Sequence, residues 1–143
     1  MAADARVLGW LTRALQHEFS AVQQYLAQSV LARLSGQPQL AEELHGEALH
    51  ELEHAQRLMQ RLIELGVAPS AGALAPARLG RGVGDFATLN RQLEQTAVVL
   101  YQDAADHARR VRDTASEALL RELAHDEAQH YRAWSQHPGP DGS

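Results

Sequence analysis

Glutamate and histidine residues recur in this sequence at a spacing that suits metal binding. The pattern Glu-x-x-His occurs five times, at Glu42/His45, Glu47/His50, Glu51/His54, Glu122/His125 and Glu127/His130. On an α-helix, residues with this separation lie on one face, so both side chains of a pair can reach the same ion. The chain has no cysteine, so a metal must use imidazole nitrogen and carboxylate oxygen, which suits iron, manganese or zinc.

A second spacing singles out two of these five pairs. Glu18 precedes Glu51 in the chain by the same interval by which Glu94 precedes Glu127. At the same interval before the other three pairs stand residues that cannot bind a metal through a side chain: Gly9, Ala14 and Leu89. The two sets that remain, one in each half of the chain, therefore repeat each other with one constant offset.

We therefore predict a dinuclear metal centre with the ligands Glu18, Glu51, His54, Glu94, Glu127 and His130. Each histidine would bind one ion, Glu18 and Glu94 would be terminal ligands, and Glu51 and Glu127 would bridge the ions, as in di-iron helix bundles. Two divalent ions would neutralise four glutamates. Bridged ions about 3.5–4 Å apart suit two-electron chemistry on dioxygen or peroxide.

Four helices are predicted to position these side chains, over about residues 4–34, 39–65, 85–111 and 114–136. Proline and glycine are absent from residues 10–35, 47–65 and 85–137, and they cluster at 36–38 and 66–84. Each predicted helix has an apolar stripe that a glutamate interrupts. Asp85 and Thr114 are predicted N-caps. Short connections make two antiparallel hairpins, and the long segment 66–84 lets the second hairpin start at the opposite end. This is the topology of a ferritin-like four-helix bundle, an all-α fold over residues 1–137 with a flexible tail at 138–143.

Composition narrows the class of protein. A chain of 143 residues with 45% apolar residues has room for one domain with a core. The net charge of -5 argues against binding nucleic acid through phosphates. Neither a membrane-spanning apolar run nor a signal-peptide pattern is present, so we expect no membrane association and a cytoplasmic location.

The sequence resembles the bacterioferritins over about residues 4–135. The resemblance is carried by residues 15–25, LQHEFSAVQQY, by residues 51–55, ELEHA, and by residues 126–130, DEAQH. It implies a ferroxidase that oxidises Fe(II) to Fe(III) with O2 or H2O2, for iron storage or detoxification, with Tyr25 near the site as an electron donor.

The sequence differs from the bacterioferritin family in two respects. Bacterioferritins bind haem through a methionine directly after the first bridging glutamate, and Leu52 stands there, so haem binding in this way is not expected. Residues 138–143 leave no room for the family's short fifth helix. We expect a homo-oligomer of at least two subunits. The sequence does not decide whether a cage of 24 subunits forms.

Other interpretations of the same residues remain. The protein could be a cage-less di-iron oxidase or oxygenase of an organic substrate, or a metal-binding scaffold with a redox-inert ion such as zinc. Tyr25 could be a packing residue, and Tyr101 and Trp134 are interpreted as core. Glu47 and His50 are interpreted as a surface pair. Asn90 and Asp126, each four residues before a predicted ligand, are candidates for orienting one.

Overall fold

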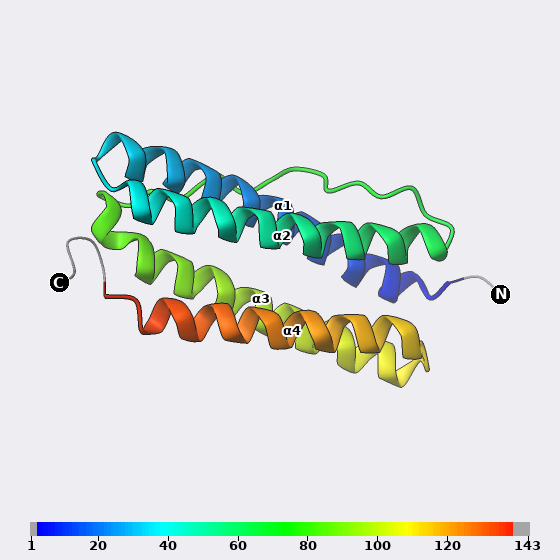
Figure 1. Ribbon diagram of the computed structural model, residues 1–143. Helices are drawn as coiled ribbons and strands as arrows, with labels where there is room; N and C mark the ends of the chain where they lie inside the picture. The colour runs from blue at the N-terminus through cyan, green and yellow to red at the C-terminus, as the bar shows by residue number, and fades with distance from the viewer. Residues whose placement is uncertain (1–2, 139–143) are drawn as a thin grey trace.

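The computed structural model describes residues 3–138, and it forms a bundle of four long helices (Figure 1). The elements are α1 (Ala5–Leu34), α2 (Pro38–Glu64), the short 3-10 helix η1 (Val83–Asp85), α3 (Phe86–Arg110) and α4 (Thr114–Ser135). The predicted helices are confirmed to within a few residues. Most of the predicted tail lies outside the described residues, so the predicted domain limits stay a prediction. Within residues 3–138, no helix is long and apolar enough to cross a membrane.

The connections between helices follow local chemistry. After α1, Gly36 has a φ of 77°, and the Gln37 N–H closes the turn by donating to the Ala32 carbonyl at 2.8 Å. A left-handed residue after a helix favours glycine. After α3, however, the residue in this conformation is Arg112, with a φ of 61°. That turn therefore carries backbone strain that a glycine would avoid.

The predicted caps of the second hairpin need correction. Asp113, and not Thr114, is the N-cap of α4, because its side chain accepts a hydrogen bond from the Ser116 N–H at 3.0 Å. Asp85 precedes α3 but makes no side-chain capping bond there. Its carboxylate instead accepts a hydrogen bond at 2.8 Å from the N–H of Arg81, which precedes it in the crossover. The 3-10 turn that enters α3 replaces the predicted side-chain cap.

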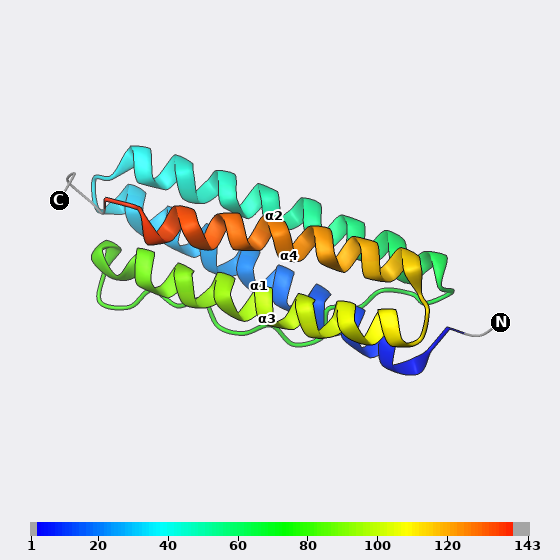
Figure 2. The same ribbon diagram turned by 90° about the horizontal axis from the view of Figure 1, so that it is seen from below.

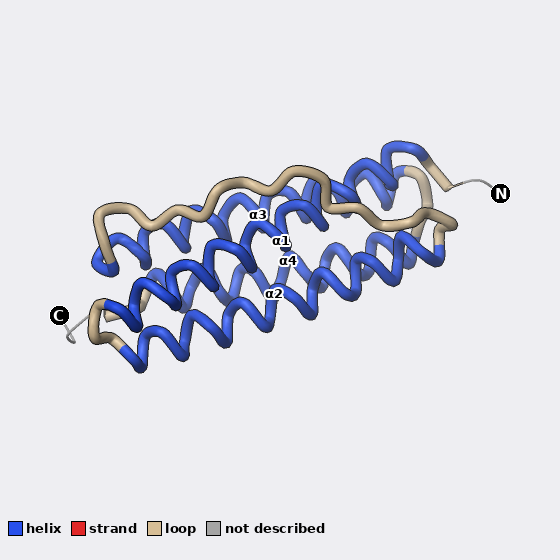
Figure 3. Tube along the Cα trace, turned by 90° about the horizontal axis from the view of Figure 1, so that it is seen from above, coloured by secondary structure: helices blue, strands red, loops and turns tan. Residues whose placement is uncertain are grey.

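The long crossover between α2 and α3 runs along the outside of the bundle from one end to the other (Figures 1 and 3). Side chains of α1 hold it in place. Gln16 and Gln23 donate to the carbonyls of Ala73 and Ala75, and Ser20 accepts from the Ala75 N–H at 3.0 Å. The crossover brings the chain back to the end where α1 ends and α2 begins, so α3 runs antiparallel to α4, as α1 does to α2 (Figure 2).

The core consists of two apolar clusters, one towards each end of the bundle. One includes Leu15, Ala55, Ala97 and Ala124, and the other includes Ala21, Ala48, Phe86 and Trp134. On each helix the change from one cluster to the other occurs near a buried glutamate. The middle of the bundle is therefore polar and enclosed by apolar residues on both sides.

Candidate metal centre

The structure brings all six predicted ligands together in the middle of the bundle. Glu18 comes from α1, Glu51 and His54 from α2, Glu94 from α3, and Glu127 and His130 from α4. All four glutamates are 0% exposed. Such burial costs several kcal/mol for each ionised carboxylate unless a positive charge compensates it.

The two histidines define the two halves of the centre. His54 Nδ1 lies 3.3 Å from Glu127, 3.7 Å from Glu18 and 3.9 Å from Glu51, measured to the nearest carboxylate oxygen. His130 Nδ1 lies 3.2 Å from both Glu51 and Glu127, and 3.7 Å from Glu94. Glu51 and Glu127 thus face both halves, whereas Glu18 and Glu94 each face one. This is the arrangement that bridging and terminal ligands need, and the ligand roles themselves stay a prediction.

Several polar atoms of the centre lack hydrogen-bond partners. Within residues 3–138, both oxygens of Glu51 and Glu127, one oxygen each of Glu18 and Glu94, and Nδ1 of each histidine are buried without a hydrogen bond. A buried polar group without a partner is destabilising by about 1–3 kcal/mol. Oxygen and nitrogen donors converging without partners fit a pair of divalent cations of the iron, manganese or zinc type.

Protonation of the centre reflects the same crowding. Burial, together with the negative charge of Glu127, raises the pKa of Glu94 to about 8. Burial also raises the pKa of Glu51 well above its usual value, with the charge of Glu18 as the next cause. Burial would raise the pKa of Glu127 as well, but the close contacts with His130 and His54 outweigh it and lower that pKa. Burial thus favours the protonated forms of Glu51 and Glu94 when no cation is bound.

The histidines retain their protons for the corresponding reason. Burial by itself disfavours the charged imidazolium, but the surrounding carboxylates outweigh it. Contacts with Glu127 and Glu18 raise the pKa of His54 to about 10, and contacts with Glu127 and Glu94 raise the pKa of His130 to about 11. A metal ion must displace these protons to reach the ring nitrogens.

Two tyrosines reach the terminal glutamates. The predicted neighbour of the centre, Tyr25, is 0% exposed and its hydroxyl donates to Glu94 Oε1 at 2.5 Å. The same hydroxyl accepts from Trp134 Nε1 at 3.1 Å. Tyr101, on α3, is also 0% exposed and its hydroxyl donates to Glu18 Oε1. Burial raises the pKa of both phenols well above the usual value, so both are protonated at neutral pH. The interpretation of Tyr101 and Trp134 as core residues is confirmed, but it missed their polar contacts.

A further carboxylate that the sequence interpretation assigned to the surface lies beside the centre. The side chain of Glu47 is 19% exposed and its Oε2 lies 3.5 Å from His130 Nδ1. It is close enough to Glu51, Glu94 and His130 for the four to share one ion. Its partner His50 is 60% exposed, so only half of the surface interpretation holds. The signal in the sequence was the position of Glu47 four residues before Glu51, one turn away on the same face.

The two residues considered for orienting ligands behave differently. Asp126 does contact a predicted ligand, with Oδ2 at 3.3 Å from His54 Nε2, so it orients a histidine of the other hairpin and not His130. Asn90 makes no hydrogen bond to Glu94. Its amide instead accepts from Gln24 at 3.0 Å and donates to Gln28 at 2.8 Å, which ties α1 to α3.

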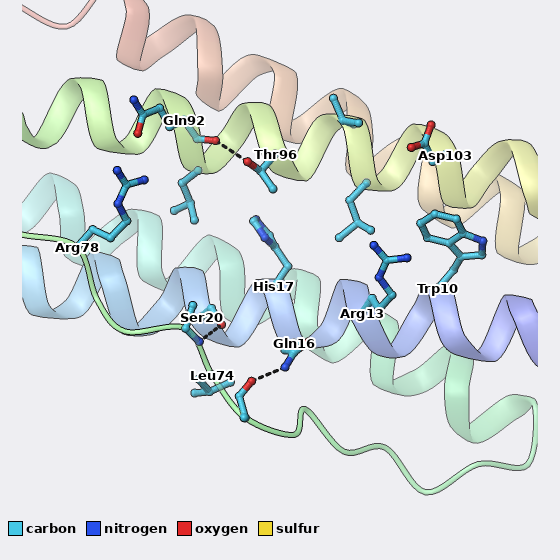
Figure 4. Close-up of a pocket in the computed structure, with 15 residues that line it drawn as sticks. Trp10, Arg13, Gln16, His17, Ser20, Leu74, Arg78, Gln92, Thr96 and Asp103 are labelled. Atoms are coloured by element: carbon cyan, nitrogen blue, oxygen red, sulfur yellow. Dashed lines mark hydrogen bonds between the residues drawn. The ribbon is translucent and has the colours of Figure 1, made fainter.

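A separate cavity of about 730 Å³ lies between α1, α3 and the crossover (Figure 4). His17 points across it towards α3, with Arg78 to one side and Arg13 to the other. The Arg13 guanidinium lies 4.6 Å from the centre of the Trp10 ring. None of the six predicted ligands lines this cavity, so it is distinct from the centre between the helices.

Comparison with known proteins agrees with the fold. The family model described as the ferritin-like domain matches residues 10–137. Bacterioferritin of Rhodobacter capsulatus is 30% identical over 91% of this chain and 81% of its own length, and that of Brucella melitensis is 28% identical over the same shares.

A solved structure agrees as well. The structure of Rhodobacter capsulatus bacterioferritin with a metal-free dinuclear site and haem iron in a crystallographic special position superposes with a TM-score of 0.90. It is 29% identical and covers 94% of this chain and 84% of that one. The match spans all four helices that supply the buried carboxylates, and the chain belongs to the ferritin-like domain family, with bacterioferritins among its relatives.

Proposed function

We propose that this protein is a bacterioferritin-like ferroxidase. It binds two Fe(II) ions per chain between Glu18, Glu51, His54, Glu94, Glu127 and His130, and oxidises them to Fe(III) with O2 or H2O2 for iron storage or detoxification. The observation that carries this proposal is the convergence, from four helices, of carboxylate and imidazole atoms that are buried without partners. The bacterioferritin relatives support iron as the metal.

Each residue has a task in this reaction. The carboxylates of Glu51 and Glu127 face both histidines and hold the two iron ions close together. Paired Fe(II) supplies two electrons to one oxidant. The hydroxyl of Tyr25 fixes Glu94 and is placed to give an electron, and Asp126 fixes the His54 ring from its outer side. The apolar clusters at both ends keep bulk water out.

Anaerobic iron loading followed by air tests the proposal. Two equivalents of Fe(II) per chain should give a rapid ferric-oxo absorbance in the wild type and not in Glu51→Ala. Glu53→Ala is the matched control, because Glu53 is an exposed glutamate on the same helix, and it should behave like the wild type. An absent signal in the wild type, or the same signal in all three proteins, contradicts a ferroxidase centre.

Native mass spectrometry with metal analysis tests the assembly and the metal together. We propose a homo-oligomer of at least two subunits, and about 24 subunits would favour storage in a cage. Bound zinc or manganese in protein from its native host, in place of iron, would contradict the assignment of the metal. With Leu52 in place of the haem-binding methionine, we propose that haem is not bound at that position, which the absorbance spectrum of the purified protein tests.

A further inference from the structure

The two halves of the candidate centre share one more feature beyond the six ligands. Tyr25 follows Glu18 at the same short interval in the chain at which Tyr101 follows Glu94. The two tyrosines are thus related by the same offset that relates the two ligand sets. In the structure the contacts cross over: Tyr25 of α1 donates to Glu94 of α3, and Tyr101 of α3 donates to Glu18 of α1. Each half therefore has its own buried phenol on its terminal carboxylate.

This contact provides what a redox-active tyrosine needs. Oxidation of a phenol breaks its O–H bond, so a base must accept the proton when the electron leaves. For Tyr101 that base is Glu18 Oε1, the acceptor of its hydrogen bond. The other oxygen, Oε2, faces His54 and the interior of the centre, so a single carboxylate would separate the phenol from an ion held there.

We propose that Tyr101 is a second one-electron donor, which serves the half of the centre that Tyr25 does not contact. This inference rests on the proposed ferroxidase function. Reduction of one O2 to two waters takes four electrons and four protons. Two Fe(II) supply two electrons, and Tyr25 and Tyr101 supply one electron and one proton each. The remaining two protons come from solvent, and the products are two Fe(III), two waters and two tyrosyl radicals.

The surroundings of the two phenols differ, and this makes the proposal specific. The Tyr25 ring stacks with Trp134 at 6.2 Å between ring centroids, and Trp134 in turn contacts the ring of His137 at 4.9 Å. This chain of rings leads out of the core and gives an electron from a further Fe(II), which becomes Fe(III), a path to reduce the Tyr25 radical. Within residues 3–138, the Tyr101 hydroxyl has Glu18 as its single hydrogen-bond partner and no ring contact. A radical on Tyr101 is therefore longer-lived than one on Tyr25.

Freeze-quench EPR of protein loaded with two Fe(II) per chain and mixed with O2 tests this. The chain has three tyrosines, so Tyr131→Phe is the control and the double variant Tyr25→Phe/Tyr131→Phe leaves only Tyr101. We expect a short-lived and a persistent tyrosyl signal in the wild type and in Tyr131→Phe. Tyr101→Phe should lose the persistent signal, and the double variant should keep it. Tyr25→Phe/Tyr101→Phe should release H2O2 where the wild type does not.

The outcomes separate this inference from the proposed function. Normal ferric-oxo absorbance without any radical in Tyr25→Phe/Tyr131→Phe, the variant that keeps only Tyr101, overturns the role of Tyr101 and leaves the proposed ferroxidase function intact. Absent ferric-oxo absorbance in the wild type overturns the ferroxidase. Co(II) titration of the same variants, followed by visible absorbance, detects a purely positioning role. A tenfold weaker Co(II) binding in Tyr101→Phe with both radical signals unchanged would overturn electron donation.

Discussion

Replacement of Glu51 by glutamine should make the metal-free protein more stable and the metal-bound protein less stable. Glu51 is 0% exposed, and both of its oxygens are buried without a hydrogen bond. In Glu51→Gln, the new amide is neutral without taking up a proton, and it offers two N–H donors to Glu18, Glu94 and Glu127. Relief of an unpaired buried group of this kind contributes about 1–2 kcal/mol. For a chain of this size the melting temperature should rise by about 3–10 °C.

Metal binding should make the wild type more stable than Glu51→Gln. At a free Co(II) concentration of about 100 times Kd, binding stabilises the wild type by about 2.7 kcal/mol. Loss of a shared ligand that weakens binding about 100-fold would leave the variant a gain of only about 0.4 kcal/mol at the same concentration. The wild type thus gains more from Co(II) binding than the variant does, and this difference exceeds the extra stability of the variant without metal. With Co(II), the wild type should be the more stable protein by roughly 1 kcal/mol.

Thermal unfolding followed by circular dichroism, in EDTA and in Co(II), measures both states. Glu53→Gln removes the same formal charge from an exposed site on α2, so it should shift neither curve by more than about 0.5 kcal/mol. If Glu51→Gln lowers the melting temperature in EDTA, then the carboxylate has a structural partner in the metal-free protein. If Co(II) raises the melting temperatures of variant and wild type equally, Glu51 is no ligand. Either result refutes the reasoning.

Three further predictions concern single contacts. Arg112→Gly should raise the free energy of unfolding by about 1 kcal/mol in chemical denaturation, because glycine adopts the positive φ without strain, and no gain would contradict strain at this turn. Asp113→Ala should lower it by about 1 kcal/mol through loss of the α4 cap. Partial burial acts to raise the pKa of Asp113, but hydrogen bonds with Ser116 and the charge of Arg61 lower this pKa below 3.8. The stability that the Asp113 carboxylate contributes should therefore persist at neutral pH and disappear only as the pH falls below that value. A difference in the free energy of unfolding between wild type and Asp113→Ala that is the same at pH 7 and pH 2 would contradict this. Asp126→Asn should weaken Co(II) binding about 10-fold by loosening His54, while Glu122→Gln, at an exposed neighbour on the same helix, should leave it unchanged.

The sequence by itself determined the class of fold and the set of candidate ligands. Helical periodicity is a local property, and the spacing of proline and glycine marked the four helices because those residues disfavour helix interiors. The repeated offset selected Glu18 and Glu94 from a chain with many acidic residues, since a symmetric centre requires equivalent residues in both hairpins. The structure brings those six side chains together, and it adds Glu47 to them.

Tertiary structure decided which other groups reach the centre. Tyr101 and Glu18 are far apart in the chain. The Tyr101 hydroxyl on α3 can donate to the Glu18 carboxylate on α1 only because these two helices pack against each other. Asn90 has the same spacing to a ligand as Asp126, yet it faces Gln24 and Gln28 because α1 packs on that side of α3. Contacts of this kind depend on the rotation of each helix about its axis, which is set by the fit of side chains across the bundle and not by spacing within one helix.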